Sequence, residues 1–327
     1  MAFPNVTDII ATTIESRSRK IADGVTSNNA LLARLKARGK VKTFSGGTKI
    51  IQELSFAENS NAGWYSGYDL LPVGVSDVIS AAEYDIKQAA VPVVISGLEQ
   101  LQNSGRERMI DLLEARIAVA ESTMKNLISA GIYSDGTGAG GKQIDGLDAA
   151  ISDTPAVGSY GGIDPATWSF WQNQYVTANY DTSTLIPAMN LMYSNLVRGA
   201  DRPDLIVADG AMWNLYLSSL QAQQRFTNTD TADAGFQSIK FMDADVVLDG
   251  GIYTGGVTGA AGAQTRTMYF LNTDYIFFRP HSQRNFTSLS PNKRYAVNQD
   301  AEVQILAWAG NMTTSGRQFH GRMLDSA

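Results

Sequence analysis

The pattern of apolar and polar positions predicts one long helix in the middle of the chain. Between residues 106 and 131, apolar side chains recur at helical spacing on a single stripe, formed by Met109, Leu113, Ile117, Met124 and Ile128. Glu121 stands four residues before Lys125, a favourable pair on a helix surface. Since each residue adds about 1.5 Å, the helix would be about 39 Å long. That exceeds the usual length of a helix in a globular protein.

Residues 41–96 follow a different, alternating pattern that is typical of half-buried strands. Residues 49–56 predict one strand, and residues 84–87 and 91–95 predict a second one that continues past Pro92. Because proline has no N–H to donate, we expect this strand at a sheet edge. Between the strands lie Trp64, Tyr65 and Tyr68, separated by glycines. A hairpin this long buries little against itself, so it needs a partner surface.

The remainder of the chain predicts a mixed α/β region followed by returning strands. Helices are expected to begin after Ser183 and Asp209, two residue types that cap helix N-termini. The expected strands cover residues 204–208, 245–248, 267–271, 275–278, 301–306 and 316–323. Residues 250–262, rich in Gly, Ala and Thr, predict a surface loop.

The N-terminal segment differs from the rest of the chain in charge. Residues 1–40 predict two short helical pieces with too little apolar material to form a core, so we interpret them as an arm. Residues 1–50 contain nine Lys/Arg and three Asp/Glu, a charge of +6, so a chain total of −6 leaves −12 for the remainder. A basic arm on an acidic body favours an anionic partner, either nucleic acid or an acidic protein. The alternative is a solvated face carrying Arg34, Lys36, Arg38, Lys40 and Lys42.

Composition excludes several classes of site and location. Hydrophobic residues make up 44% of the 327 residues, enough for a sizeable core, and there is no cysteine. Disulfides, thiolate zinc sites, iron–sulfur clusters and cysteine nucleophiles are therefore excluded. No apolar run approaches the roughly 18 residues of a membrane span, and the first residues lack the pattern of a secretory signal. We expect a protein of the bacterial cytoplasm with no membrane partner.

Motifs that carry chemistry are incomplete. The two histidines, His281 and His320, have no second histidine at ligand spacing. Residues 136–142 match the GxxxxGK core of a phosphate-binding loop, but Gln143 stands where a Ser or Thr should follow, and a helix rather than a strand precedes it. Ser122 and Lys125 form an SxxK pair without its partner motifs. We expect no catalytic residue, cofactor or metal site, although a hydrolase that uses two carboxylates leaves no local sequence mark.

Several segments resemble the major capsid proteins of tailed bacteriophages. They are Trp64-Tyr-Ser-Gly-Tyr-Asp69, Ala82-Glu-Tyr-Asp-Ile-Lys-Gln-Ala-Ala-Val-Pro-Val93, the long helix, residues 135–147 and Gly161-Gly-Ile-Asp-Pro-Ala-Thr-Trp-Ser-Phe-Trp171. The order of parts is also similar, from basic arm, hairpin and long helix through a glycine-rich exit to an α/β domain and returning strands. The likeness covers residues 40–320 and implies an α+β fold of the Johnson type.

This resemblance implies a division of the chain into five parts. They are an N-terminal arm (1–40), an extended β-hairpin called the E-loop (41–96), a spine helix in a peripheral domain (97–146), an α/β axial domain (147–280), and strands that return to the peripheral domain (281–327). The E-loop would lie across a neighbouring subunit, so Trp64, Tyr65 and Tyr68 are candidate interface residues. The alternative is that they pack on the subunit's own body. The basic residues between 34 and 42 would face packaged DNA.

The function that the resemblance implies is structural rather than enzymatic. Copies of the chain would assemble as hexamers and pentamers, in the host cytoplasm, into the icosahedral head that encloses double-stranded DNA in the virion. DNA on the inner face is an expected partner, and portal, scaffold and decoration proteins are further candidates. The nearest alternative is the shell protein of an encapsulin-like nanocompartment. More distant alternatives are a phage-associated hydrolase and a tail or decoration protein.

Overall fold

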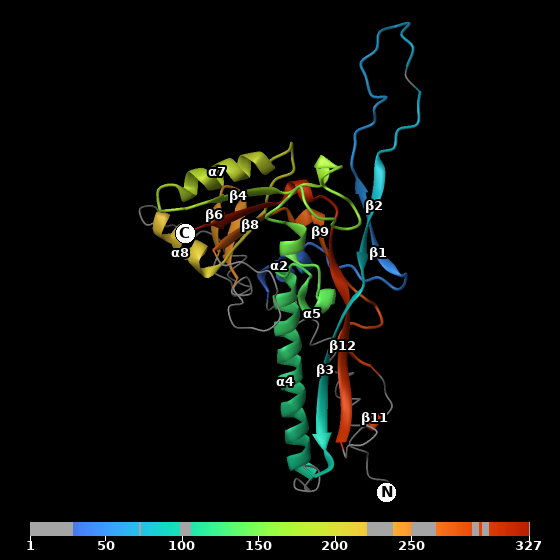
Figure 1. The fold of residues 1–327 in the computed structure, drawn as a ribbon, viewed down its shortest axis with the longest axis vertical. Helices are drawn as coiled ribbons and strands as arrows, with labels where there is room; N and C mark the ends of the chain where they lie inside the picture. The colour runs from blue at the N-terminus through green and yellow to red at the C-terminus, as the bar shows by residue number, and fades with distance from the viewer. Residues whose placement is uncertain are drawn as a thin grey trace.

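The computed structural model describes residues 29–71, 73–98, 106–220, 238–249, 266–289, 294–295 and 301–326. In these ranges the chain forms three β-sheets, one long helix and several short helices. The hairpin and the long helix extend in opposite directions from a central body (Figure 1). The expected loop at residues 250–262 lies outside the described residues.

The first sheet is the expected hairpin. Strand β1 (Lys49–Ser55) pairs antiparallel with β2 (Ile79–Asp85), from Lys49 opposite Asp85 to Ser55 opposite Ile79. The side chains of β1 alternate strictly between exposed and buried positions, which confirms the strand expected at residues 49–56. The prediction of one strand from residue 84 to 95 is wrong, because β2 ends at Asp85 and β3 (Lys87–Ser96) joins a different sheet.

The second sheet is organised by one long strand, β12 (Ala301–Thr314). Along one edge β12 pairs with β3, and along the other it pairs with β9 (Ile276–Pro280), β10 (Thr287–Ser288) and β11 (Arg294–Tyr295). Pro92 lies opposite Ile305, and in the described part of the chain β3 pairs with β12 alone. The expectation that Pro92 marks a sheet edge is therefore confirmed.

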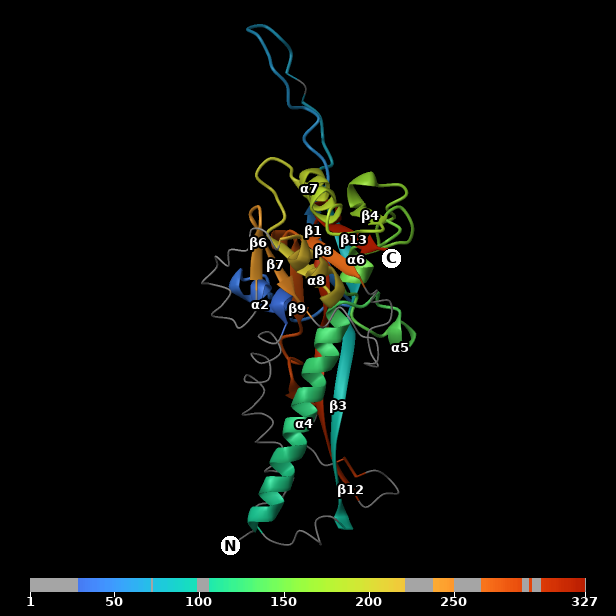
Figure 2. The same cartoon turned by 90° about the vertical axis from the view of Figure 1, so that its left-hand side faces the viewer.

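The long helix α4 (Arg106–Ile132) has the extent that its apolar stripe predicts. It lies beside β3, as two perpendicular views show (Figures 1 and 2). Its side chains Ile117, Met124 and Ile128 are buried in the main core. Two short helices follow, α5 (Gly138–Gly141) and α6 (Leu147–Ala150).

The third sheet is mixed and six-stranded, in the order β4-β13-β8-β5-β7-β6. Ile206 and Ala208 of β5 face the core beneath helices α7 (Leu185–Leu196) and α8 (Gly210–Ser219), whereas Leu205 and Val207 face the main core. This explains why β5 is apolar at every position. The strands are β4 (Gln174–Ala178), β5 (Leu205–Ala208), β6 (Ser238–Phe241), β7 (Ala244–Leu248), β8 (Thr267–Leu271) and β13 (Gly321–Asp325), with 3-10 turns η1 (Ser169–Trp171), η2 (Thr273–Tyr275) and η3 (Arg317–Phe319) between elements.

Helix caps agree with the sequence at one of two places. Asp209 caps α8, since its carboxylate accepts the Met212 N–H at 2.8 Å. The prediction that Ser183 caps α7 is wrong, because the helix begins later, at Leu185. Asp181 organises this turn instead and accepts the backbone N–H groups of Ser183 and Thr184 at 2.8 Å. Hydrogen bonds from Ser183 and Thr184 lower the pKa of Asp181 to about 2.

The described part of the expected N-terminal arm belongs to the body. Helix α2 (Ala30–Ala37) is capped by Asn29, whose side chain accepts the Leu32 N–H at 3.1 Å. Leu31, Leu32 and Leu35 are fully buried in the main core. The interpretation of this stretch as an arm outside the core is wrong, because these three leucines are part of the core. Burial of each leucine stabilises the body by about 1.5–3 kcal/mol.

Candidate functional site

The tip of the β1–β2 hairpin, residues 56–78, exposes apolar side chains. Trp64 and Tyr68 have the full exposure of an extended chain, at 106%, and Tyr65 is 68% exposed. The sequence-predicted trio therefore lies together on one projecting loop, and the alternative that it packs on the chain's own body is wrong. Four exposed aliphatic residues of the same tip were not predicted from the sequence, and these are Leu70, Leu71, Val73 and Val75. The signal that could have indicated them is the stretch of residues 70–75, which contains no polar side chain.

Polar contacts within the tip give it a defined shape. Asn61 donates to the Gly74 carbonyl at 2.6 Å across the two arms of the loop. At the far end, the Asp69 carboxylate accepts the Ser66 N–H at 2.8 Å. The backbone is thus held by its own hydrogen bonds, while the aromatic rings stay in solvent. A preformed apolar surface of this kind loses little conformational entropy when a partner covers it.

An aromatic cluster anchors the base of the hairpin to the body. Phe56 lies 5.6 Å from Phe170 and 5.8 Å from Trp168, measured between ring centroids. Further down, Glu83 donates its N–H to Gly161, and the Tyr84 hydroxyl donates to Thr314 at 2.9 Å. The aromatic segment at residues 161–171 therefore serves to hold the root of the hairpin.

The basic residues between 34 and 42 lie against carboxylates of the same chain. Arg38 lies 3.2 Å from both Asp204 and Asp274, and Lys40 lies 3.2 Å from Asp274. Arg34 pairs with Asp204 and Asp245 at 3.4 Å.

The other two basic residues of this group are exposed. Lys42 has its ammonium 5.2 Å from the Phe277 ring centre, and Lys36 has a further interaction. The sequence showed the charge imbalance but not the carboxylate partners of the basic residues, because those carboxylates lie far along the chain. The prediction that these residues face DNA stays a prediction.

The two histidines and the residues of the incomplete motifs lie in the core, on a helix surface or in a turn. His320 is fully buried, and His281 packs edge-on against Phe44 with ring centroids 4.9 Å apart. Ser122 lies on the exposed side of α4, in the middle of the helix. The GxxxxGK stretch follows the end of α4, and the four-residue α5 within it is interrupted by left-handed backbone at Ala139 and Gly140.

The described residues contain neither a metal-ligand group nor a membrane-spanning helix. They contain no group of three or more His, Asp or Glu side chains placed to hold a metal ion. None of the described helices has both the length and the hydropathy needed to cross a membrane.

Comparison with solved structures identifies the fold. The capsid chain of cyanophage A-1(L) superimposes with a TM-score of 0.64 at 16% identity, over 88% of this chain and 92% of that one. A chain of the mature capsid of bacteriophage PhiM1 gives 0.55 at 12% identity, over 89% and 87%. The SrpI encapsulin of Synechococcus elongatus PCC 7942 gives 0.53 at 7% identity, over 89% and 87%.

Sequence comparison adds nothing to this likeness, since no family model and no curated protein matches the chain. At such low identities the structural likeness defines the fold and nothing finer. The chain has the mixed α/β fold of phage capsid subunits, which the encapsulin shares.

Proposed function

We propose that this chain is the major capsid subunit of a tailed bacteriophage, a structural protein whose copies enclose double-stranded DNA in an icosahedral head. One observation carries the proposal: a chain with the phage-capsid fold projects a hairpin whose aromatic tip is exposed. In this proposal residues 41–96 are the E-loop and α4 is the spine of a peripheral domain. The six-stranded sheet with α7 and α8 forms the axial domain.

Exposure of the apolar side chains of the tip to water is unfavourable. Soluble monomers seldom expose many large apolar side chains on one loop unless a partner covers them, and seven are exposed on the described part of this tip. Tyrosine and tryptophan are enriched in the buried centres of interfaces, because each buries a large rigid surface. Trp64, Tyr65 and Tyr68 are therefore our proposed contacts with a neighbouring subunit.

Identical subunits suit such a contact. A tip that binds a different surface on the next copy makes a head-to-tail contact, which closes into a ring when the rotation between copies permits. Hexamers and pentamers are the rings that an icosahedral shell requires in this proposal. Many weak copies of one contact then stabilise the shell through their number.

DNA on the inner face is a separate part of the proposal, supported by the sequence charge of the N-terminal segment. Arg34, Arg38 and Lys40 have carboxylate neighbours within the chain. Lys36 and Lys42 are exposed, and we propose them together with Arg34, Arg38 and Lys40 as the residues that face phosphates. Neutralisation of phosphates is independent of sequence and weakens steeply with salt.

A second candidate function is supported by the likeness to the SrpI encapsulin. A nanocompartment shell would have the same fold and the same need for contacts between copies, but would enclose protein. The contents of the particles distinguish the two functions. Nuclease-protected DNA supports the phage head, and a co-purified cargo protein supports the compartment.

The deciding experiment is size-exclusion chromatography with electron microscopy of the purified chain, expressed alone and with the genes that neighbour it. Closed shells of uniform size are the expected result. A monomer or small oligomer under both conditions contradicts the shell proposal. The chain would then be tested as a hydrolase or as a decoration protein. A hydrolase that uses two carboxylates should lose its activity on single Asp or Glu substitutions.

A further inference from the structure

Three basic side chains gather around one phenylalanine of β9. Lys40 and Lys42 precede the hairpin in sequence, whereas Phe277 and Arg279 belong to β9 itself. The Nζ atoms of Lys40 and Lys42 lie 5.4 and 5.2 Å from the centre of the Phe277 ring. The guanidinium carbon of Arg279 lies 6.0 Å from the same point. We call these four residues the Phe277 cluster.

Backbone pairing brings the cluster together on one face. The Lys42 N–H donates to the Phe278 carbonyl at 3.0 Å, and the Phe278 N–H donates to the Lys40 carbonyl at 3.2 Å, so this segment runs parallel to β9. Val41 lies opposite Phe278; Phe278 is buried in the main core, and Val41 packs against that core. Because side chains alternate along a strand, their sequence neighbours lie on the other face. The Phe277 cluster is thus turned away from the main core.

The positive charge of the cluster is poorly compensated within the chain. Lys40 contacts the Asp274 carboxylate at 3.2 Å, and Arg279 donates to the neutral Gln52 side chain at 2.9 Å. In the part of the chain that the structure describes, neither Lys42 nor Arg279 forms an ion pair. Burial lowers the pKa of Arg279, as expected of a cation without a carboxylate neighbour. Three neighbouring cations with one carboxylate repel one another, so an added anion stabilises them.

The cluster is accessible from solvent and has an apolar floor. Lys42 is exposed and Arg279 is half-buried, whereas Phe277 is only 8% exposed. A buried ring beneath the cations excludes water on that side, so their attraction to an anion is stronger than on an open surface. Lysine provides a point charge for a phosphate, and arginine provides a fork of N–H donors that matches phosphate oxygens. The composition of the cluster therefore suits a phosphate group.

We propose that Lys40, Lys42 and Arg279 together bind a phosphate group. Arg279 is a member of this site that the charge of the N-terminal segment could not indicate, because it lies on β9. The phosphate group belongs either to a DNA backbone or to free phosphate, and the two sources share the same chemistry. The site deepens the DNA part of the proposed function, on which the DNA source rests. Its affinity for phosphate is measured on the unassembled subunit.

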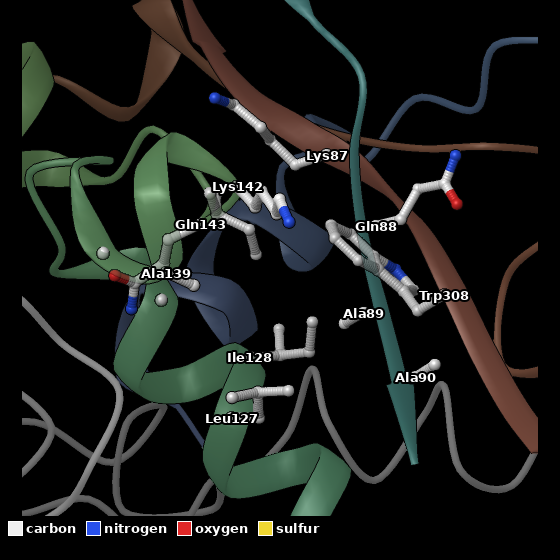
Figure 3. A pocket seen from close by; sticks show the side chains of 13 residues that line it. Lys87, Gln88, Ala89, Ala90, Leu127, Ile128, Ala139, Lys142, Gln143 and Trp308 are labelled. Atoms are coloured by element: carbon white, nitrogen blue, oxygen red, sulfur yellow. The ribbon is translucent and has the colours of Figure 1, made fainter. Parts of the chain in front are cut away.

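Binding of inorganic phosphate tests the site directly. Isothermal titration calorimetry at fixed ionic strength compares the wild-type chain with Lys42→Gln, which removes one exposed charge. The dissociation constant for phosphate is expected to rise about tenfold, since a hydrogen bond to a charged group is lost. The matched control is Lys142→Gln, which removes an exposed charge from the turn that follows α4 (Figure 3). This control should bind phosphate as the wild-type chain does.

A second pair of variants tests the part played by Arg279. Arg279→Gln should weaken phosphate binding by a similar factor, whereas Arg279→Lys keeps the charge and should retain most of the affinity. Because Arg279 also contacts Gln52 at the base of the hairpin, the melting temperature of both variants is measured as well. Wild-type affinity in a folded Arg279→Gln chain contradicts the proposal. If Arg279→Gln does not fold, Lys42→Gln and its control decide the question.

DNA binding identifies the source of the phosphate. Fluorescence anisotropy with a labelled DNA duplex, repeated over a range of salt concentrations, gives the slope of log K against log salt concentration. Loss of one phosphate contact in Lys42→Gln should reduce the magnitude of this slope by about 1, and Lys142→Gln should leave it unchanged. A reduced slope supports the site and assigns it to the DNA backbone. Phosphate binding that depends on Lys42, with an unchanged DNA slope, supports the site and assigns it to free phosphate.

Three results overturn the phosphate site. They are equal phosphate and DNA affinities in the wild-type chain and Lys42→Gln, equal losses in Lys42→Gln and Lys142→Gln, and tighter binding of a polyglutamate peptide than of phosphate or DNA. The last result would assign the surface to an acidic protein. Assembly is measured separately: a chain that binds phosphate here but forms no shells contradicts the proposed function alone. Shells whose subunits fail these tests contradict the phosphate site alone.

Discussion

At the scale of single residues, His320 couples the stability of the fold to pH. It is fully buried, its Nδ1 accepts the Asn272 N–H at 3.3 Å, and its Nε2 lies 3.4 Å from the Thr314 hydroxyl. Burial, aided by the charge of Arg317, lowers the pKa of His320 from 6.5 to about 3. The unfolded chain takes up a proton near pH 6.5, whereas the folded chain does so only near pH 3. The stability due to neutral His320 is therefore present above pH 6.5 and lost as the pH falls.

We predict that His320 reduces the free energy of unfolding by about 2 kcal/mol between pH 6.5 and 5, since one pKa unit is worth about 1.4 kcal/mol. Urea unfolding of the purified chain measures this at each pH. His320→Gln removes the titrating group and should remove this part of the slope. Parallel curves for the two proteins contradict the prediction.

Asp148 has the opposite dependence. Its carboxylate pairs with the buried Arg322, and burial raises the pKa of Asp148 from 3.8 to about 6. The folded chain then holds a proton that the unfolded chain has released. This contribution to stability is complete below pH 3.8 and is lost as the pH rises through about 6.

Between pH 4 and 6 the contributions of His320 and Asp148 to the free energy of unfolding change in opposite directions with pH. We predict that a variant without one of the two groups shows the pH dependence of the other. His320→Gln should leave a chain whose free energy of unfolding falls by about 2 kcal/mol as the pH rises over this range. Asp148→Asn should leave one whose stability rises with pH over the same range. Equal pH slopes in both variants would show that the two groups do not titrate as described.

At the scale of elements, close backbone contact fixes the turn that follows α4. A β-carbon on Gly146 would lie 2.5 Å from the Ile132 carbonyl oxygen and 2.6 Å from that of Gly131. Both neighbours are backbone atoms, so they have little freedom to move. The end of α4 and the start of α6 are thus in contact at a distance that only glycine permits.

We predict that Gly146→Ala lowers the free energy of unfolding by about 1–3 kcal/mol, the usual cost of overpacking. The matched control is Gly210→Ala in the first turn of α8, where a β-carbon meets nothing within 4 Å. This control should be neutral or slightly stabilising, because alanine favours helices over glycine. Thermal unfolding of both variants measures the difference, and equal melting temperatures would disprove the contact argument.

Elements with a local pattern could be predicted from the sequence. The apolar stripe of α4, the alternation of β1 and the Asp209 cap are each set by residues within a few positions. The break between β2 and β3 could not, because it depends on which sheet each strand joins. The partners of the basic residues also escaped prediction, since Arg34 and Asp204 are 170 positions apart.

At the scale of the whole molecule, most large apolar side chains are buried in two cores, whereas those of the hairpin tip are exposed. The two cores close the body, with leucines of α2 filling one side of the six-stranded sheet and α7 and α8 covering the other. Apart from Phe56 at its base, the hairpin tip takes part in neither core. The sequence indicated that the hairpin needs a partner, and the arrangement in space shows that its tip projects away from the body (Figure 1).

Because the tip takes part in neither core, we predict that assembly and stability separate on truncation of its aromatic side chains. Trp64→Ala/Tyr68→Ala should leave the melting temperature of the unassembled subunit unchanged, since both rings are fully exposed. Particle yield should fall by about tenfold or more, because aromatic anchors at interfaces are worth about 2 kcal/mol or more each. Trp64→Phe/Tyr68→Phe keeps most of the apolar surface and should still assemble. A loss of melting temperature would place the rings in the subunit's own fold, and unchanged assembly would remove the tip from the contact between copies.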